Sequence, residues 1–456
     1  MSQISTFPSF SWTDQEPFKN IFNNHKAPQM QILKYMGNKR RLLNWLMTSF
    51  NEELKDGDTF LDLFAGTSSV GYALKPKVKV IANDIQKYSS VISSALLQFN
   101  GIITEDDFDK DLAKFYKKNL SRLTEIFGAA VQAEQKLLIS DNIKDYKQFC
   151  LEVPKYGEPV SRDKFKLNSY SREISIQKRR ELRTKFPYIL FSTYYPNTFF
   201  GLRQCLEIDS IRFAIDQVKD EHKKAVYLSC LMYSISKAVN SSGHFAEYLN
   251  HHSNYASRLI VEQRKISVLS EFLFKLAEFT KLFTQNKWKN EVYNCDYQIL
   301  IDKLHRNKKL NKVDLIYIDP PYTSAQYSRF YHIPETLVKY DYPTITKDHS
   351  NYKLVKGRYR DDRHQSKFSN SGSVEDAFRE LFGAISSKSN ATLAISYSDN
   401  SILRPVERLI EIAKEYYETI ETKNGYSHSA QGSRFSVNGK GNKDLHEYLL
   451  ICKPKS

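Results

Sequence analysis

The hydrophobic pattern of the chain changes twice along its length. Short apolar, β-branched runs lie near both ends of the sequence and are typical of buried strands; they occupy 59–63, 78–85, 292–297, 313–318, 391–397 and 447–452. Between about 105 and 288, apolar residues recur instead at helical spacing among charged ones, over 106–127, 132–149, 211–239 and 257–283. The pattern therefore predicts an α/β sheet interrupted by a large, mainly helical insertion.

The same changes divide the chain into four parts. We expect an irregular N-terminal arm over 1–30, a first half of the sheet domain over 31–105, the helical insertion over 106–287 and a second half over 288–456. A chain of 456 residues is long enough to bury a large core. Two distant parts of the sequence should therefore meet in one sheet.

Positive charge is in excess. The chain has 67 Lys and Arg against 52 Asp and Glu, a formal net charge of +15, which favours a polyanionic partner. No apolar run approaches a membrane-spanning helix, and residues 1–30 lack the zones of a signal peptide, so we expect no membrane partner and a cytoplasmic protein. The five cysteines and the pair His251 and His252 lack metal-ligand spacing, so no metal site is expected.

The turn after the run at 313–318 is the main candidate for chemistry. Asp319 stands where the strand must end, because Pro320 and Pro321 cannot extend a central strand. In an open α/β sheet, groups just beyond the carboxyl ends of the strands line the ligand crevice. The turn therefore holds a carboxylate, rigid carbonyl groups and the ring of Tyr322 at the mouth of a cleft; the alternative is that it only ends a strand.

Two features nearer the N-terminus predict a mononucleotide-type site. The run at 59–63 leads into a loop of small residues around Gly66, so the backbone can approach a ligand at the start of the next helix. The run at 78–85 places Asp84 at a strand end, the position that contacts ribose hydroxyls in this architecture. With only Gly66 and Gly71, the loop is not the dinucleotide fingerprint.

In this order, the motifs resemble those of Dam-like, alpha-group (D12 class) adenine methyltransferases, which transfer a methyl group from S-adenosylmethionine to adenine N6 in DNA. The resemblance covers about half of the chain; it rests on a basic segment at 33–43, the loop at 58–71, the acid Asp84, the insertion, the strand at 292–297 and the turn Asp319-Pro320-Pro321-Tyr322. It implies a Rossmann-like, S-adenosylmethionine-dependent sheet. The sequence departs from relatives in a less glycine-rich loop at 65–68 and in a longer insertion.

The resemblance also implies roles for individual residues. The cofactor would be contacted by Tyr35, Gly37, Lys39, Asp62, Phe64, Gly66, Ser68, Asp84 and Asp296. Asp296 would meet the adenine amino group of the cofactor, although it could also cap a helix over 298–304. For catalysis, Asp319 and the Pro320 carbonyl would accept the N6 hydrogens of a flipped adenine while Tyr322 stacks on it.

Contacts with double-stranded DNA are expected from two places. In the family the insertion carries target recognition, and within it Arg203 and Gln204 suit bidentate contacts with guanine and adenine. The alternative for this aromatic stretch, 194–204, is a core plug. The second place is the basic segment 341–373, expected as a mobile loop that orders on DNA with Lys356, Arg358 and Arg360 facing phosphates.

Three other functions share these motifs: N4-cytosine methylation of DNA, N6-adenine methylation of RNA, and nucleic-acid binding by a decayed enzyme. The aspartate at position 319 favours adenine, and the presence of all four candidate acids, Asp62, Asp84, Asp296 and Asp319, argues against decay. The resemblance allows for a cognate restriction endonuclease as a partner. It leaves the recognition sequence and the oligomeric state open.

Overall fold

The protein is described here from a computed structural model, which covers residues 31–33, 39, 42–104, 106–153, 184–241, 244–282, 285–321, 323–429 and 444–455. Within it, Ile32–Ser456 form one compact unit. The expected arm at 1–30 and the candidate residues Tyr35, Gly37 and Tyr322 lie outside the described residues. The domain boundaries expected from the sequence stay a prediction.

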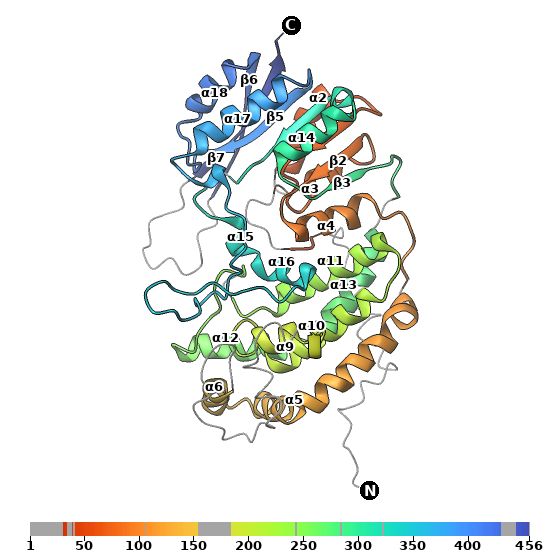
Figure 1. Cartoon of the computed structure of the whole chain (residues 1–456), viewed down its shortest axis with the longest axis vertical. Helices are drawn as coiled ribbons and strands as arrows, with labels where there is room; N and C mark the ends of the chain where they lie inside the picture. Colours follow the sequence, from red (N-terminus) through yellow and green to blue (C-terminus); the bar gives the residue numbers. More distant parts are fainter. Residues whose placement is uncertain are drawn as a thin grey trace. The chain divides into compact units, whose positions relative to one another are not determined.

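A seven-stranded sheet organises the described residues (Figure 1), in the order β3-β2-β1-β4-β5-β7-β6. Its strands are β1 (Thr59–Asp62), β2 (Lys79–Asn83), β3 (Glu291–Tyr293), β4 (Leu315–Ile318), β5 (Thr392–Ser398), β6 (Tyr417–Ser429) and β7 (Asp444–Pro454). The first five in sequence pair in parallel, and the β6 and β7 hairpin adds two antiparallel strands beside β5. The α/β prediction of a Rossmann-like sheet is confirmed.

The sheet is covered on both faces because side chains alternate along each strand. Leu61 of β1 and Ile316 of β4 belong to the core beneath α14 (Tyr297–Arg306), α17 (Val374–Ser386) and α18 (Val406–Lys414). On the other face Phe60 and Tyr317 pack against Phe50 of α2 (Leu43–Glu53), with ring centroids 5.7 and 5.4 Å from that of Phe50. Near them α3 (Ser69–Leu74) and α4 (Lys87–Leu97) contact β2.

The order of the strands creates a crevice beside β1. This strand has β2 on one side and β4 on the other, so the chain connections leave it in opposite directions. Just past its end, the Leu63 N–H donates to the Tyr317 carbonyl at 3.1 Å and the Ala65 N–H donates to the Asn83 carbonyl at 2.8 Å. The segments that follow these three strands are therefore held together at one edge of the sheet.

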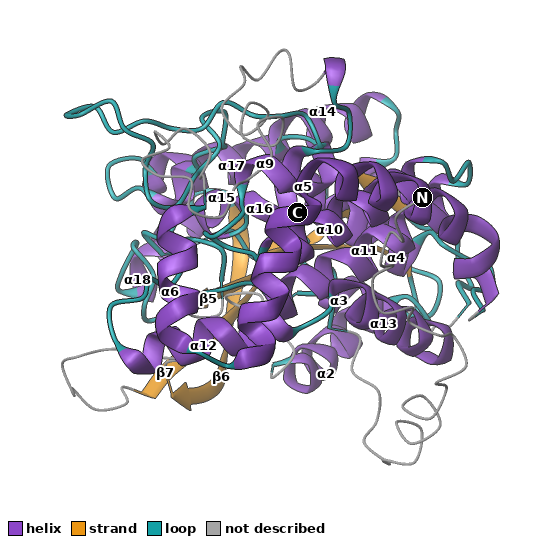
Figure 2. Ribbon diagram, turned by 90° about the horizontal axis from the view of Figure 1, so that it is seen from below, coloured by secondary structure: helices purple, strands orange, loops and turns teal. Residues whose placement is uncertain are grey.

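Helices dominate the described residues between β2 and β3, and Figure 2 shows the helices of the protein in purple. After α4, the described helices of this part are the π-helix η2 (Phe108–Ala113), α5 (Lys114–Ser140), α6 (Ile143–Glu152), α9 (Leu190–Tyr194), α10 (Leu202–Asp216), α11 (Glu221–Ala238), α12 (Asn254–Lys265) and α13 (Val268–Leu282). The helical stretches expected at 106–127 and 132–149 are not separated at 128–131, because α5 continues through these residues. Helix α11 packs on α4 and so joins the insertion to the sheet. Among the described residues, no helix combines the length and apolar character of a membrane span.

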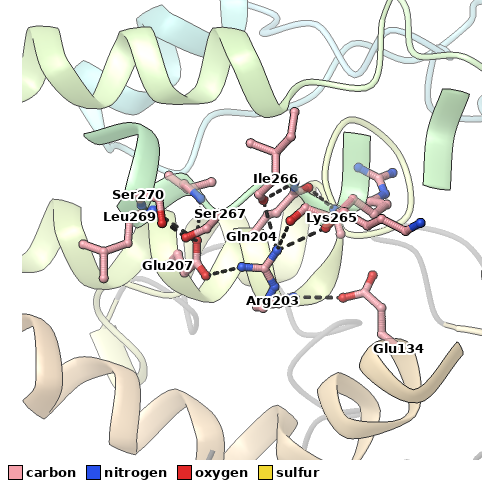
Figure 3. Close-up of polar contacts among 12 residues, drawn as sticks. Glu134, Arg203, Gln204, Glu207, Lys265, Ile266, Ser267, Leu269 and Ser270 are labelled. Carbon is pink, nitrogen blue, oxygen red and sulfur yellow. Dashed lines mark hydrogen bonds and ion pairs between the residues drawn. The ribbon is translucent and has the colours of Figure 1, made fainter. Parts of the chain in front are cut away.

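Charged side chains within the insertion bind the free backbone groups at helix ends, and the partly buried Arg203 is one of these side chains (Figure 3). Its Nη2 lies 3.0 to 3.2 Å from the carbonyl oxygens of residues 264–266, at the C-terminal end of α12. Its Nη1 lies 2.6 Å from Glu207 Oε1. The other oxygen of Glu207 accepts the Val268 N–H at 2.6 Å, at the start of α13. This ion pair thus joins two helix ends of opposite partial charge.

Gln204 and Glu134 complete this network. Gln204 is fully buried; its amide nitrogen donates to the carbonyls of Gln263 and Ile266 at 2.7 and 2.9 Å, and its oxygen accepts the Gly201 N–H at 2.9 Å. Glu134 of α5 accepts the Leu202 N–H at 3.1 Å at the start of α10. A Cβ on Gly201 would lie 2.7 Å from Glu134 Oε1, so any other residue there would displace the Glu134 carboxylate. The groups of Gln204 that were expected to read base edges are thus occupied within the fold, as are those of Arg203.

This network predicts a stability effect instead of a DNA-binding effect. Replacing Arg203 with methionine leaves the Glu207 carboxylate without its partner at the α12 to α13 turn, and we expect a loss of about 3 kcal/mol in the free energy of unfolding. Chemical denaturation measures it, with exposed Arg258→Met as the control. A loss of DNA affinity at unchanged stability would restore the base-reading hypothesis.

Candidate active site

A cavity opens at the edge of the sheet where β1, β2 and β4 end. Nine residues expected from the sequence line it: Lys39, Asp62, Phe64, Gly66, Asp84, Asp296, Asp319, Pro320 and Pro321. They come from segments up to about 280 residues apart. The fold therefore brings the candidate cofactor residues and the candidate catalytic turn to one place.

The loop after β1 is shaped by two residues with left-handed backbone conformations. Gly66 has φ +52°, and its N–H donates to Asp84 Oδ2 at 2.9 Å, which ties this loop to the end of β2. Ser68 has φ +53° and is fully buried, with its hydroxyl 2.5 Å from that of Ser93 on α4. Thr67 and Ser69, rather than Ser68, line the cavity. Ser68 therefore shapes the loop and its side chain does not line the cavity, while its expected contact with the cofactor stays a prediction.

Asp84 is held rigidly at the end of β2. Its Oδ1 accepts the Gln86 N–H at 2.8 Å while its Oδ2 accepts the Gly66 N–H. Burial raises the pKa of Asp84 to about 6, even though these hydrogen bonds lower it. Asp84 also lines the cavity.

Asp62, the last residue of β1, is a buried carboxylate that lacks a full set of partners. It is 1% exposed, and its Oδ1 has no hydrogen-bond partner among the described residues. Burial raises its pKa well above the ordinary value, and the neighbouring carboxylates of Asp319 and Asp84 raise it further. A buried acceptor without a donor, at the wall of a cavity, fits a positively charged or donor group of a ligand.

Asp319 follows β4 and faces a buried lysine. The Lys39 ammonium lies 3.1 Å from Asp319 Oδ1 and 3.5 Å from Glu447 Oε2 of β7. Burial raises the pKa of Asp319 to about 6; the Lys39 charge lowers that pKa, and the Glu447 charge raises it. Lys39 was expected to contact the cofactor, and the structure adds a direct contact with the catalytic candidate. Glu447 was missed, although a charged residue in an apolar strand run was a signal for it.

Asp296 lies at the cavity and also caps a helix. Its side chain accepts the Gln298 N–H at 2.8 Å at the start of α14, and the residue lines the cavity wall. The two interpretations of this acid, a ligand contact and a helix cap, are therefore compatible.

Residues 364–368 form a further wall of the cavity that the sequence did not indicate. Ser369 donates its hydroxyl to the Pro321 carbonyl at 3.2 Å, and the Ser366 N–H donates to Gln326 Oε1 at 2.9 Å. Phe368 packs edge-on against Phe64, with ring centroids 5.6 Å apart. These contacts fix the proline turn against the loop after β1.

The three basic residues expected to face phosphates have different surroundings. Arg360 is 1% exposed; its guanidinium makes two 2.7 Å contacts with Asp341 and also pairs with Asp362. Arg358 is 3% exposed. The Lys356 side chain is 46% exposed and lies 3.3 Å from Glu247. Arg358 and Arg360 are therefore structural residues in this conformation, because burial removes them from any phosphate; Lys356 stays accessible.

Comparison with known proteins identifies the family. The model of the D12 class N6 adenine-specific DNA methyltransferases matches residues 35–150 and 167–408, so the chain belongs to that family. It is 26% identical over 434 residues to Modification methylase LlaI of Lactococcus lactis subsp. lactis, covering 92% of this chain and 55% of the relative.

Two further relatives are also modification enzymes. Type II methyltransferase M.FokI of Planomicrobium okeanokoites is 25% identical over 427 residues, with 92% of this chain and 52% of the relative covered. Modification methylase StsI of Streptococcus sanguinis is 24% identical over 435 residues, with 93% and 52% covered. The chain thus spans about half the length of these relatives.

Proposed function

We propose that this protein transfers a methyl group from S-adenosylmethionine to the N6 atom of adenine in duplex DNA, as the modification enzyme of a restriction-modification system. The observation that carries the proposal is the position of Asp319: the acid of the proline turn lies in the same cavity as the acids that end β1 and β2. The family match supports adenine N6 in DNA over cytosine N4 and RNA. A cognate restriction endonuclease is the proposed partner.

The cavity residues fit S-adenosylmethionine. Asp62, with its unpartnered buried oxygen, would hold the amino group of the methionine part, Asp84 the ribose hydroxyls and Asp296 the adenine amino group. The turn at Gly66 lets the backbone approach the cofactor closely. The bound cofactor supplies an electrophilic methyl group on sulfur.

The residues of the chain then orient the acceptor. The exocyclic amine of adenine is a weak nucleophile because its lone pair is delocalised into the ring. Asp319 and the Pro320 carbonyl accept hydrogen bonds from its two N–H groups. These hydrogen bonds orient the N6 lone pair toward the methyl group and stabilise the positive charge that develops on N6. The adenine must leave the base stack to reach the cavity. Stacking of Tyr322 on the flipped base remains the sequence prediction.

Expression in a host without adenine methylation tests the proposal. Mapping modified bases in the host DNA should show N6-methyladenine in one sequence context, and the DNA should then resist an endonuclease that cuts that context. Unmodified adenine, despite soluble and folded protein, would overturn the proposal. Methylated cytosine would show that cytosine, and not adenine, accepts the methyl group.

The charges around Asp319 predict a pH dependence of transfer. The reaction needs ionised Asp319. Therefore kcat/KM for DNA should fall as the pH drops through about 6, the pKa of Asp319 in the folded protein without substrate. Removing the Lys39 charge with Lys39→Gln raises that pKa and moves the fall to higher pH. Removing the opposite charge with Glu447→Gln moves it to lower pH. Initial rates from pH 5 to 8 measure both, and shifts in the same direction would contradict the geometry.

A further inference from the structure

The segment between α16 (His332–Lys339) and the cavity wall at 364–368 forms an antiparallel finger, residues 344–361, where the sequence suggested a structureless loop. Ile345 pairs with Arg360 and Lys347 with Leu354. The Thr346 N–H donates to the Tyr359 carbonyl at 2.9 Å. In Figure 1 the finger is the long teal loop at the left. The finger is therefore held by backbone pairing and is not an irregular loop.

The base of the finger is anchored next to the candidate active site. Arg360 bridges Asp341 and Asp362 across the two arms. Beside it, the guanidinium groups of Arg329 and Arg363 lie 5.2 and 5.3 Å from the centre of the Tyr359 ring. The chain then continues directly into the cavity wall. The direction of the finger is therefore fixed relative to the cavity.

The tip of the finger is built to display one aromatic ring. Residues 347–353 are all exposed. Asp348 accepts the Ser350 N–H at 2.8 Å with its side chain and the Tyr352 N–H at 2.9 Å with its carbonyl, so the turn is stiff. Tyr352 itself is 78% exposed, between Lys353 and the nearby Lys347. Its ring has no stacking partner among the described residues.

The backbone of Tyr352 has a left-handed conformation. Its φ of +55° is unfavourable for a bulky side chain and is better suited to glycine or asparagine. Tyr340 and Tyr342 also have positive φ. The Tyr342 hydroxyl accepts the Ile189 N–H at 3.0 Å and the Tyr340 hydroxyl accepts the Leu190 N–H at 3.4 Å, so these two rings pack inside the fold. At Tyr352 the hydrogen bond from its own N–H to the Asp348 carbonyl holds this conformation, and the exposed ring makes no stacking contact among the described residues. The ring is therefore available to a partner.

We propose that the finger docks on duplex DNA and that Tyr352 stacks on a base or wedges between two base pairs flanking the target adenine, with Lys347 and Lys353 on the phosphates. Aromatic stacking and apolar wedges open base steps, and flanking lysines neutralise the backbone. Eight residues of extended chain reach about 25 Å, so the ring meets bases beside the target and not the target itself. The inference rests on the proposed function, because it makes Tyr352 a positioning residue for base extrusion.

A photo-crosslinking experiment tests the contact without requiring catalysis. A benzophenone amino acid at position 352 should crosslink to a labelled 30-base-pair DNA duplex under ultraviolet light. The control carries the same group at position 255, where the exposed Tyr255 lies on α12, and it should not crosslink to the duplex. No crosslink at 352, or a preference for RNA of the same sequence over the duplex, would overturn the proposal.

Single-turnover methylation of unmethylated duplex DNA tests the role. Tyr352→Ala should slow transfer about tenfold or more, as loss of one base stack implies. Tyr352→Phe, which keeps the ring, and Tyr255→Ala should keep the wild-type rate. An alanine variant as fast as wild type contradicts the wedge while the proposed function stands. A wild-type protein that transfers no methyl group contradicts the proposed function, and the crosslink then decides about the finger alone.

Discussion

Asp319→Asn should reduce methyl transfer to DNA by about a thousandfold or more, with little change in the affinity for S-adenosylmethionine. Asparagine keeps the size of the side chain but removes the negative charge that stabilises positive charge on N6. It also leaves the Lys39 ammonium, 3.1 Å away, facing a neutral amide instead of its counter-charge. Single-turnover kinetics with labelled cofactor measure the rate, and titration calorimetry measures cofactor binding.

The control for this variant is Asp302→Asn, which makes the same charge change on an exposed side chain of α14. It should keep the wild-type rate. Thermal unfolding of both variants separates a loss of catalysis from a loss of folded protein. Turnover close to wild type in folded Asp319→Asn would rule out the mechanism.

Asp62→Asn should change cofactor binding and stability in opposite directions. The loss of a charge-assisted hydrogen bond to the cofactor amino group should weaken binding about 10- to 100-fold. In the free protein the same substitution removes a buried charge with a raised pKa, so the free energy of unfolding at pH 7 should rise by about 1 kcal/mol or more.

The pH dependence gives the sign of the stability effect. The pKa of Asp62 is higher in the folded chain than in the unfolded one, so the carboxyl destabilises the fold only where it is ionised in the unfolded chain. The gain in Asp62→Asn should therefore shrink as the pH falls toward about 4, the ordinary pKa of aspartate. Denaturation at pH 7 and pH 4 measures it, with exposed Asp56→Asn as control. Lower stability at pH 7, with normal cofactor affinity, would show that Asp62 is a structural residue.

The sheet and the cavity could be predicted from the sequence because their signals are local. Apolar runs mark β1, β2, β4 and β5, and the proline turn and the loop at Gly66 mark where two of these strands end. Parallel strands then place their carboxyl ends at one edge, so Asp62, Asp84 and Asp319 meet without any knowledge of long-range contacts.

The partners of individual side chains could not be predicted in this way. An arginine side chain can bind guanine or the carbonyl groups at a helix end equally well. For Arg203, only the packing of α10 against the α12 to α13 turn determines which of the two it binds. Arg360 forms its ion pair with Asp341 only because the finger folds back on itself. The Lys39 contact with Glu447 joins residues 408 positions apart. Such choices depend on tertiary structure.

The most direct test of the central claim is methyl transfer from labelled S-adenosylmethionine, measured side by side on unmethylated duplex DNA and on RNA, with wild-type protein and Asp319→Asn and with the product nucleoside identified. The account predicts N6-methyladenine in the duplex with wild-type protein, little or none in RNA, and none with the variant. Transfer to RNA in preference to DNA, a product other than N6-methyladenine, or equal transfer by both proteins would contradict it.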